Sequence, residues 1–228
     1  MDIDKLKALV AEAAVTEIRS NLTPNSVLGI GTGSTTNIFI ERLGTIKEEF
    51  EGAVASSKAS EKKLIEAGIR VYDINSLKKI DVYVDGADEA DRNLCLTKGG
   101  GGALTREKIV SSAAEKFICI IDYTKEVETL GKFPIPIEVI PMAMSLVEKR
   151  IHLMGGFVTH REGFITDNGN IILDAHNLDI PNPLMIEDLI NGIPGVVTVG
   201  LFAKERPDLL LIAMPDGKIQ TKQQHVIS

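Results

Sequence analysis

Residues 31–35, Gly-Thr-Gly-Ser-Thr, stand between a short apolar run at 27–30 and a stretch of apolar residues with helical spacing. Free N–H groups and the helix dipole at such a junction favour an anion, and glycines let the backbone approach a phosphate closely. The hydroxyls of Thr32, Ser34 and Thr35 add side-chain donors. We therefore interpret the segment as a phosphate-binding loop. The structural alternative is a tight turn in which Ser34 or Thr35 caps the helix.

The loop matches neither of two common nucleotide-binding patterns. A dinucleotide fingerprint beginning at Gly29 would need its third glycine at Ser34, and one beginning at Gly31 would need it at Thr36. No Gly-Lys-Ser/Thr follows at the spacing of a Walker A loop. The expected ligand is therefore a single phosphate group.

Acidic residues follow the apolar run at 80–84 directly, in the order Asp85-Gly86-Ala87-Asp88-Glu89-Ala90-Asp91. If that run is a strand, the acids lie at the carboxyl edge of the sheet, where open α/β folds bind ligands. Neighbouring carboxyl groups raise one another's pKa and share protons, which suits general acid and base chemistry. An EF-hand loop is disfavoured, because its third position is Ala87 and its late glycine is missing. A turn-capping role is plausible for Asp91 and less so for Asp85.

Four consecutive glycines, Gly99 to Gly102, follow Lys98. Each glycine loses more backbone entropy on folding than other residues do, so such a run needs a reason. The simplest reason is that the backbone lies against a ligand, with Lys98 as a nearby cation and Glu107 as a carboxylate early in the next helix. The alternative is a flexible hinge, with Lys98 and Glu107 exposed to solvent.

The spacing of apolar residues predicts the elements that position these segments. An alternation of strands and helices up to about residue 121 predicts a Rossmann-like, mostly parallel sheet with helices on both faces. The strand at 209–214 is expected to return to this sheet. The expected helices are 3–19, one that contains 38–43, 60–67 and 103–114, and the expected strands are 27–30, 53–55, 69–71, 80–84 and 117–121.

The pattern changes after Lys132, where prolines become frequent. If the strand at 164–166 extends the strand before it, the following elements run β-α-β-β-α-β, which predicts a smaller ferredoxin-like α+β domain. Its Asn168-Gly169 pair is a strong hairpin signal. We expect a catalytic domain at 1–131 with 205–228, and a small domain at 132–204. The expected strands are 135–140, 157–160, 164–166, 171–173 and 196–201, and the expected helices are 142–154 and 183–190.

Composition narrows the class of protein. The 228 residues are 44% hydrophobic, enough for a sizeable core, and the net charge of -7 disfavours a nucleic-acid binder. The first residues do not form a signal peptide, and no apolar run approaches the ~20 residues that span a bilayer. With only Cys95 and Cys119, the sequence predicts a soluble cytoplasmic protein with inert thiols.

Taken together, these segments resemble ribose-5-phosphate isomerase of the A type, and the similarity extends over nearly the whole chain. Gly102 stands where the resemblance leads us to expect alanine. The motifs that carry the resemblance are residues 31–35, 85–89, 98–101, 103–108, 131–134, 166–170, 193–197 and 215–217.

The resemblance implies a homodimeric aldose-ketose isomerase of the non-oxidative pentose phosphate pathway, without metal or cofactor. It would interconvert D-ribose 5-phosphate and D-ribulose 5-phosphate through an enediolate. By similarity, Glu107 is the base, Lys98 and the loop amides stabilise the enediolate, and Asp85 and Asp88 hold sugar hydroxyls, with Asp85 a candidate for opening the furanose ring. The implied substrate-binding residues are Lys7, Thr32, Gly33, Ser34, Thr35, Gly86, Ala87, Gly99, Gly100, Gly101 and Lys125.

Three other functions remain as alternatives. A sugar-phosphate deaminase would need a histidine beside the acids, but His152, His160, His176 and His225 lie outside the three segments. A sugar-phosphate sensor of the kind attached to transcription regulators would carry a DNA-binding module, and no residues are left for one. A CoA transferase would use an acid as nucleophile and form a thioester.

Overall fold

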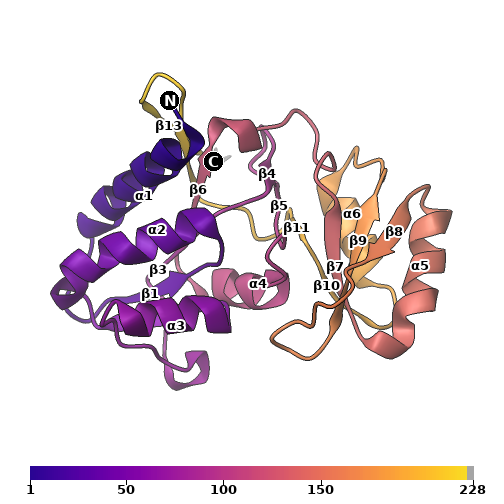
Figure 1. Cartoon of the computed structure of the whole chain (residues 1–228), viewed down its shortest axis with the longest axis horizontal. Coiled ribbons are helices and arrows are strands. Elements are labelled where there is room, and N and C mark those ends of the chain that lie inside the picture. Colours follow the sequence, from indigo (N-terminus) through magenta and orange to yellow (C-terminus); the bar gives the residue numbers. More distant parts are fainter. Residues whose placement is uncertain (225–228) are drawn as a thin grey trace. The chain divides into compact units, whose positions relative to one another are not determined.

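The computed structural model describes residues 1–224, and the chain divides into two compact units (Figure 1). Unit 1 comprises Met1–Gly86, Arg106–Lys125 and the chain from Pro207 onward. Unit 2 comprises Ala87–Thr105 and Glu126–Arg206.

Unit 1 is built on a six-stranded sheet in the order β13-β12-β6-β3-β1-β2. All its pairs are parallel except β12 with β13, so the sheet is the mostly parallel one that the sequence predicts. The return strand pairs with the parallel sheet as expected, with Leu209 opposite Ile118. The strands are β1 (Val27–Ile30), β2 (Gly52–Ala55), β3 (Val82–Asp85), β6 (Phe117–Asp122), β12 (Leu209–Ala213) and β13 (Ile219–Gln223).

Helices cover both faces of this sheet. Successive residues of a strand face opposite sides, and the residues of β1, β3 and β6 are buried on both sides. Leu28 and Ile30 of β1 share a core with α1 and α2, whereas Gly29 faces α4. A Cβ atom at Gly29 would lie 2.7 Å from Val110 Cγ1, so only glycine allows α4 to pack this closely. The helices are α1 (Ile3–Arg19), α2 (Ser34–Leu43), α3 (Lys58–Glu66) and α4 (Leu104–Ala113), with 3₁₀ turns η1 (Gly44–Glu49), η2 (Ile74–Ser76) and η3 (Tyr123–Lys125).

The order of the strands places the loops that follow β1 and β3 at a topological switch point. From β1 the chain first adds β2 on one side and then crosses to add β3 on the other side. In open α/β sheets, ligands bind outside the carboxyl ends of the strands at such a point. Residues 31–33 and 86 onward leave the sheet there.

Unit 2 contains a four-stranded antiparallel sheet in the order β10-β7-β9-β8. With its two helices it runs β-α-β-β-α-β, which confirms the predicted ferredoxin-like arrangement. Ile137 of β7, Ile151 of α5 and Ile190 of α6 lie in one core. The elements are β7 (Ile135–Val139), η4 (Pro141–Ala143), α5 (Met144–Leu153), β8 (Phe157–His160), β9 (Ile171–His176), α6 (Pro183–Asn191) and β10 (Val196–Val199).

A second sheet in unit 2, in the order β11-β5-β4, was not predicted. Its strands are β4 (Glu89–Ala90), β5 (Leu96–Thr97) and β11 (Leu201–Phe202). Because β5 pairs with β11, this sheet joins residues 87–105 to the rest of unit 2. The expected boundaries at 131 and 205 stay a prediction.

Two predicted strands are not formed. Residues 69–71 contribute only an isolated bridge between Ala53 and Val71. Residues 164–166 lie in the connection from β8 to β9, where the N–H of Thr166 donates to the carbonyl of Asn170 at 2.9 Å and closes a turn. The Asn-Gly signal therefore marks this turn rather than a hairpin with two ladder strands.

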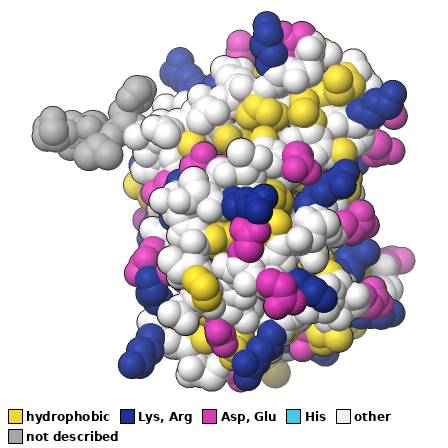
Figure 2. Space-filling model, turned by 90° about the vertical axis from the view of Figure 1, so that its left-hand side faces the viewer, with side chains coloured by type: hydrophobic (Ala, Val, Ile, Leu, Met, Phe, Trp, Pro, Cys, Tyr) yellow, Lys and Arg dark blue, Asp and Glu magenta, His cyan; other side chains and the backbone are white. Residues whose placement is uncertain are grey.

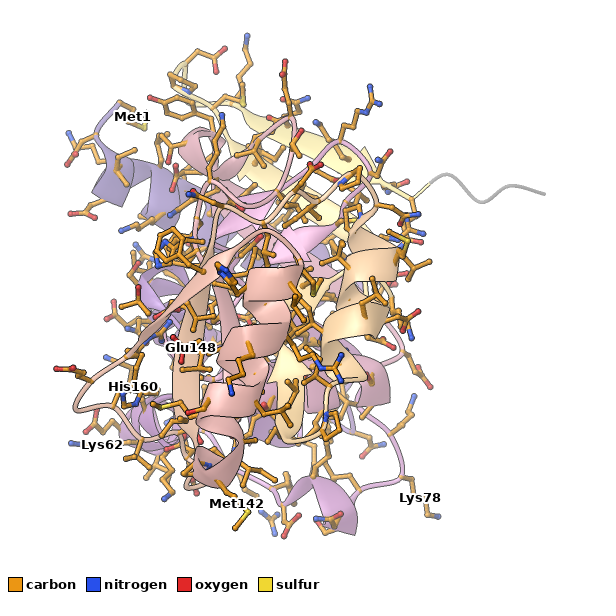
Figure 3. All side chains as sticks on the ribbon, turned by 90° about the vertical axis from the view of Figure 1, so that its right-hand side faces the viewer. Met1, Lys62, Lys78, Met142, Glu148 and His160 are labelled. Atoms are coloured by element: carbon orange, nitrogen blue, oxygen red, sulfur yellow. The ribbon has the colours of Figure 1, made fainter. Side chains whose placement is uncertain are left out.

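The surfaces are charged. The face in Figure 2 carries basic and acidic side chains interspersed, without a continuous basic patch. On α5, the exposed side chain of Glu148 points away from the ribbon, and Met142 of η4 is 97% exposed (Figure 3). No helix within residues 1–224 is long and apolar enough to cross a membrane.

Candidate active site

The predicted phosphate loop leads from β1 into α2, as expected, but its helix cap differs. Gly33, with φ at +131°, is the N-cap residue, and it supplies no side-chain cap. Ser34 and Thr35 are the first helical residues, so the expected cap by either side chain is wrong. A Cβ atom at Gly33 would meet no atom within 4 Å, so the space above the loop is open. The loop thus has an accessible helix N-terminus of the kind that binds anions.

A ring of hydroxyl groups holds the start of this loop. Thr32 Oγ1 donates to Ser57 Oγ at 2.8 Å, and Ser57 donates to Ser60 at 3.0 Å. Ser60 Oγ in turn donates to the carbonyl of Gly31 at 2.6 Å. The hydroxyl of Thr32 therefore positions the loop. This ring was not predicted, although the pair Ser56-Ser57, directly after a predicted strand, is a signal for it.

Asp85, at the end of β3, ties the same loop to the sheet. Its side chain is fully buried. Oδ1 accepts hydrogen bonds from Thr32 N at 2.9 Å, Gly86 N at 2.7 Å and Thr36 Oγ1 at 3.2 Å. Oδ2 accepts from the hydroxyl of Tyr83. The carboxylate thus organises the backbone of both loops at the switch point.

Gly31 is required by this arrangement. A Cβ atom there would lie 1.8 Å from the carboxyl group of Asp85, which no adjustment of that group could accommodate while it keeps its four donors. The glycine lets the backbone lie directly against the acid.

Tyr83 donates to one buried acid of unit 1 and feels the charge of another. Burial raises the pKa of its phenol well above the ordinary value, and the negative charges of Asp85 and Glu107 raise that pKa further. The phenol therefore stays protonated and donates to Asp85. Glu107, early in α4, is only 3% exposed. No pattern in the sequence indicates Tyr83, because all four residues of β3 are buried and no alternation of polar and apolar residues marks its face.

The two lysines of unit 1 that are predicted to bind substrate lie toward the carboxyl edge of its sheet. Lys125 ends the turn η3 that follows β6 directly. The amino terminus, which precedes α1, lies 3.3 Å from the carbonyl of Pro215, just beyond β12. Lys7 therefore sits near this edge, and its Nζ pairs with Asp4 Oδ1 at 3.4 Å.

Lys98 of unit 2 is buried, with only 2% of its surface exposed. Its N–H donates to the carbonyl of Gly200 at 2.8 Å, and its ammonium lies 5.4 Å from the centre of the Phe202 ring. The alternative of a hinge with a solvent-exposed Lys98 and Glu107 is wrong, because both side chains are buried.

Asp88 binds the glycine loop within unit 2. Its Oδ2 accepts from Gly100 N at 2.8 Å, and its own N–H donates to the carbonyl of Thr97 at 2.8 Å. A Cβ atom at Gly100 would lie 2.6 Å from Asp88 Oδ1. Asp91, by contrast, accepts from Asn93 N and Cys95 N at 2.8 Å each, which confirms its turn-capping role.

Comparison with known proteins identifies the family of this chain. Residues 52–217 match the family model described as ribose 5-phosphate isomerase A (phosphoriboisomerase A). The chain belongs to this family. The isomerase therefore interconverts ribose 5-phosphate and ribulose 5-phosphate, and the deaminase, sensor and CoA-transferase alternatives are set aside.

Solved structures agree over nearly the full length of the isomerase. It is 43% identical to ribose 5-phosphate isomerase A from Neisseria gonorrhoeae, covering 98% of both chains with a TM-score of 0.92. It is 36% identical to the enzyme from Methanocaldococcus jannaschii, covering 96% of this chain and 98% of that one, with a TM-score of 0.89. A third isomerase, in complex with phospho-erythronic acid, is 36% identical over 98% of this chain and 100% of that one, with a TM-score of 0.90.

The histidines and cysteines of the isomerase lie outside the segments predicted to form the site. His152, His160 and His176 belong to unit 2, in α5, β8 and β9, and His225 lies outside the described residues. Within residues 1–224, no group of three or more His, Cys, Asp or Glu residues could hold a metal ion. Both cysteines are buried, and burial raises the pKa of Cys95 to about 11, as expected for an inert thiol.

The structure also accounts for Gly102 in the isomerase. Its φ is +75°, and a Cβ atom there would lie 2.2 Å from Cζ of Phe164. An alanine would therefore collide with the phenyl ring as well as strain the backbone. The size of Phe164 explains why this chain has glycine at position 102.

A buried carboxylate that was not predicted from the sequence holds the segment that follows the glycine loop. Glu138 of β7 is fully buried and accepts from the hydroxyl of Thr105, the second residue of α4. It also accepts from Thr166 Oγ1 at 2.9 Å, Asn168 Nδ2 at 3.1 Å and Asn170 Nδ2 at 2.8 Å. These donors from the turn at 166–170 satisfy the buried charge and hold the start of α4 in place.

Proposed function

We propose that Glu107 is the base that transfers the proton between C1 and C2 of the sugar, through an enediolate intermediate. The observation that supports this role is a buried carboxylate early in α4, beside a tyrosine that stays protonated. A C–H group beside a carbonyl is weakly acidic, so a positioned base is needed, and such a base accelerates proton transfer by about 10²–10⁴-fold.

The enediolate needs positive charge and hydrogen-bond donors, because negative charge develops on its oxygens. In this proposal Lys98 and the N–H groups of Gly99, Gly100 and Gly101 supply them. The relative bound to phospho-erythronic acid supports the idea, because the carboxylate of that acid presents two oxygens on a planar, negatively charged group, as the enediolate does.

The substrate phosphate would bind at the N-terminus of α2. Gly33, Ser34 and Thr35 present the first N–H groups of the helix, and the serine and threonine add hydroxyl donors. Thr32 would support this site through its hydrogen bonds to Asp85 and Ser57. Lys7 and Lys125 would add positive charge, since a phosphate site in a chain of net charge -7 needs local cations.

Asp85 and Asp88 would hold the sugar hydroxyls, with Asp85 a candidate for opening the furanose ring. Gly86 and Ala87 join the two acids, so an extended chain separates the α-carbons of Asp85 and Asp88 by at most about 11 Å. The fully buried Asp85 already accepts four hydrogen bonds within unit 1. Asp88 is only partly buried and is therefore the more accessible acid for a hydroxyl.

Proton NMR in D₂O tests this mechanism directly. We expect the EDTA-treated isomerase to convert ribose 5-phosphate to ribulose 5-phosphate with deuterium at C1, because a proton held by Glu107 exchanges with solvent. The Glu107→Gln variant should bind substrate but lose at least about 10²-fold in kcat. The matched control is Glu115→Gln, in which an exposed acid is changed. Near-normal turnover of Glu107→Gln would remove Glu107 from the mechanism, and loss of activity on EDTA treatment would contradict the expected absence of a metal.

We also propose that the isomerase is a cytoplasmic homodimer that serves the non-oxidative pentose phosphate pathway. Exposed apolar side chains of unit 2, including Met142, Leu153 and Phe157, support self-association. Light scattering should give about twice the 24.7 kDa of one chain; the mass of a single chain would rule the dimer out.

A further inference from the structure

Arg161 joins the glycine loop to a rigid part of unit 2. Its Nη1 atom donates to the carbonyl of Gly99 at 3.2 Å and to the carbonyl of Gly100 at 3.1 Å. The opposite edge of the same guanidinium binds Asp174 of β9, with Nε to Oδ2 at 2.9 Å and Nη2 to Oδ1 at 2.6 Å. A bidentate pair of this kind fixes the plane of the guanidinium.

The two carbonyl contacts orient two consecutive peptide groups. All peptide bonds in the described residues are trans, so each N–H points away from the carbonyl of its own peptide group. In the first group, the carbonyl of Gly99 binds Arg161 while the N–H of Gly100 donates to Asp88 at 2.8 Å. In the second group, the carbonyl of Gly100 binds Arg161, so the N–H of Gly101 is directed to the opposite side.

A glycine loop needs such an anchor to stabilise an enediolate. Gly100 and Gly101 are exposed, and without side chains they have wide backbone freedom. Donors stabilise developing charge effectively only when they are already aimed at it before the reaction. Arg161 is well placed to supply this order, because its side chain is 21% exposed, is paired with Asp174, and lies 5.6 Å from the centre of the Phe164 ring.

We propose that Arg161, held by Asp174, is a positioning residue that orients the N–H group of Gly101 for the enediolate and keeps the N–H group of Gly100 on Asp88. The inference rests on the proposed role of these N–H groups in the mechanism. Arg161 acts on the substrate only through the peptide groups that it holds.

The Arg161→Lys variant tests the proposal, because a lysine keeps the positive charge but cannot bind Asp174 in two places and reach both carbonyls. We expect kcat to fall by about 30-fold, less than the 10²–10³-fold that loss of a donor itself costs. The affinity for phospho-erythronic acid should fall by a similar factor. The affinity for inorganic phosphate should stay unchanged, because the phosphate loop belongs to unit 1.

Arg19→Lys is the matched control. Arg19 makes the same bidentate contact with Glu49, at 2.9 and 2.6 Å. This pair is exposed, and both of its residues lie far from the glycine loop along the chain. Its change should alter kcat and both affinities by less than about twofold. Asp174→Asn is a second variant, which keeps the shape of the side chain that holds Arg161 but removes its charge. It should lower kcat and the affinity for phospho-erythronic acid, as Arg161→Lys does. Thermal unfolding is measured for each protein.

The outcomes separate this inference from the proposed function. Parallel loss of kcat and of phospho-erythronic acid affinity, with phosphate affinity retained, supports Arg161 as a positioning residue. Unchanged kinetics, or an equal loss of affinity for both ligands, overturns it; if Arg161→Lys does not fold, Asp174→Asn is judged by the same criteria. A wild-type protein that forms ribulose 5-phosphate but does not bind phospho-erythronic acid would instead contradict the proposed enediolate mechanism.

Discussion

Tyr83 donates its phenolic hydrogen to Asp85, and both side chains lie on the same face of β3 because they are two residues apart in a strand. Through this bond the tyrosine supports the carboxylate that holds the N–H groups of Thr32 and Gly86. The loops that follow β1 and β3 therefore both depend on one buried phenol.

Replacement of this phenol should weaken both folding and activity. For Tyr83→Phe we expect the free energy of unfolding to fall by about 1–2 kcal/mol, because a buried carboxylate oxygen loses its donor. We expect kcat/KM to fall by about tenfold as the loops lose their fixed geometry. Tyr72→Phe is the control, since Tyr72 donates to Glu51 at an exposed site. Equal effects of the two changes in urea titrations and initial rates would show that Tyr83 has no special role.

The raised pKa of Tyr83 predicts a loss of stability at high pH. The folded protein holds this phenol protonated above the ordinary pKa of 10.0, whereas the unfolded chain releases the proton near that value. The stabilisation is therefore fully present below pH 10 and is lost as the pH rises toward the folded pKa. Urea titrations at pH 8 and pH 11 should show a larger decrease for the wild type than for Tyr83→Phe; a decrease of the same size in both would argue against this assignment.

The Gly102–Phe164 contact can be tested by a double-mutant cycle. We expect Gly102→Ala to cost about 3 kcal/mol of stability, from a positive φ and from overlap with the phenyl ring. Phe164→Ala removes the overlap but not the backbone strain. The double variant should therefore be at least about 1 kcal/mol more stable than the sum of the two single changes indicates. Strict additivity would mean that the ring moves aside freely.

The buried charge of Glu138 should matter to both the fold and the reaction. A glutamine there would set an amide NH₂ group against hydroxyl and amide donors, so we expect Glu138→Gln to destabilise by about 3 kcal/mol. We also expect kcat to fall, because Thr105 stands two residues before Glu107 in α4. Glu148→Gln, on the exposed face of α5 in Figure 3, should change stability by less than about 0.5 kcal/mol. Normal stability of Glu138→Gln would show that the fold does not depend on the negative charge at this position.

Much of the fold follows from local patterns. The alternation of apolar runs with helical spacing predicted the parallel sheet, and the β-α-β-β-α-β order predicted the antiparallel one, because burial on one or two faces leaves a period in the sequence. The residues at 69–71 and 164–166 were assigned as strands on the same evidence. They did not form ladder strands, because strand formation also depends on partners that a local pattern does not reveal.

The sequence by itself determined the family, the types of residue available for proton transfer and phosphate binding, and their places after strands and before helices. Glycine-rich loops and clustered acids are local signals, so they could be read without a structure. Only the tertiary structure showed which partners hold these residues: Tyr83 for Asp85, and Arg161 with Asp174 for the glycine loop. These partners lie in ordinary strands and turns, and their roles arise from contacts between segments far apart in the chain, where spacing along the sequence carries no information.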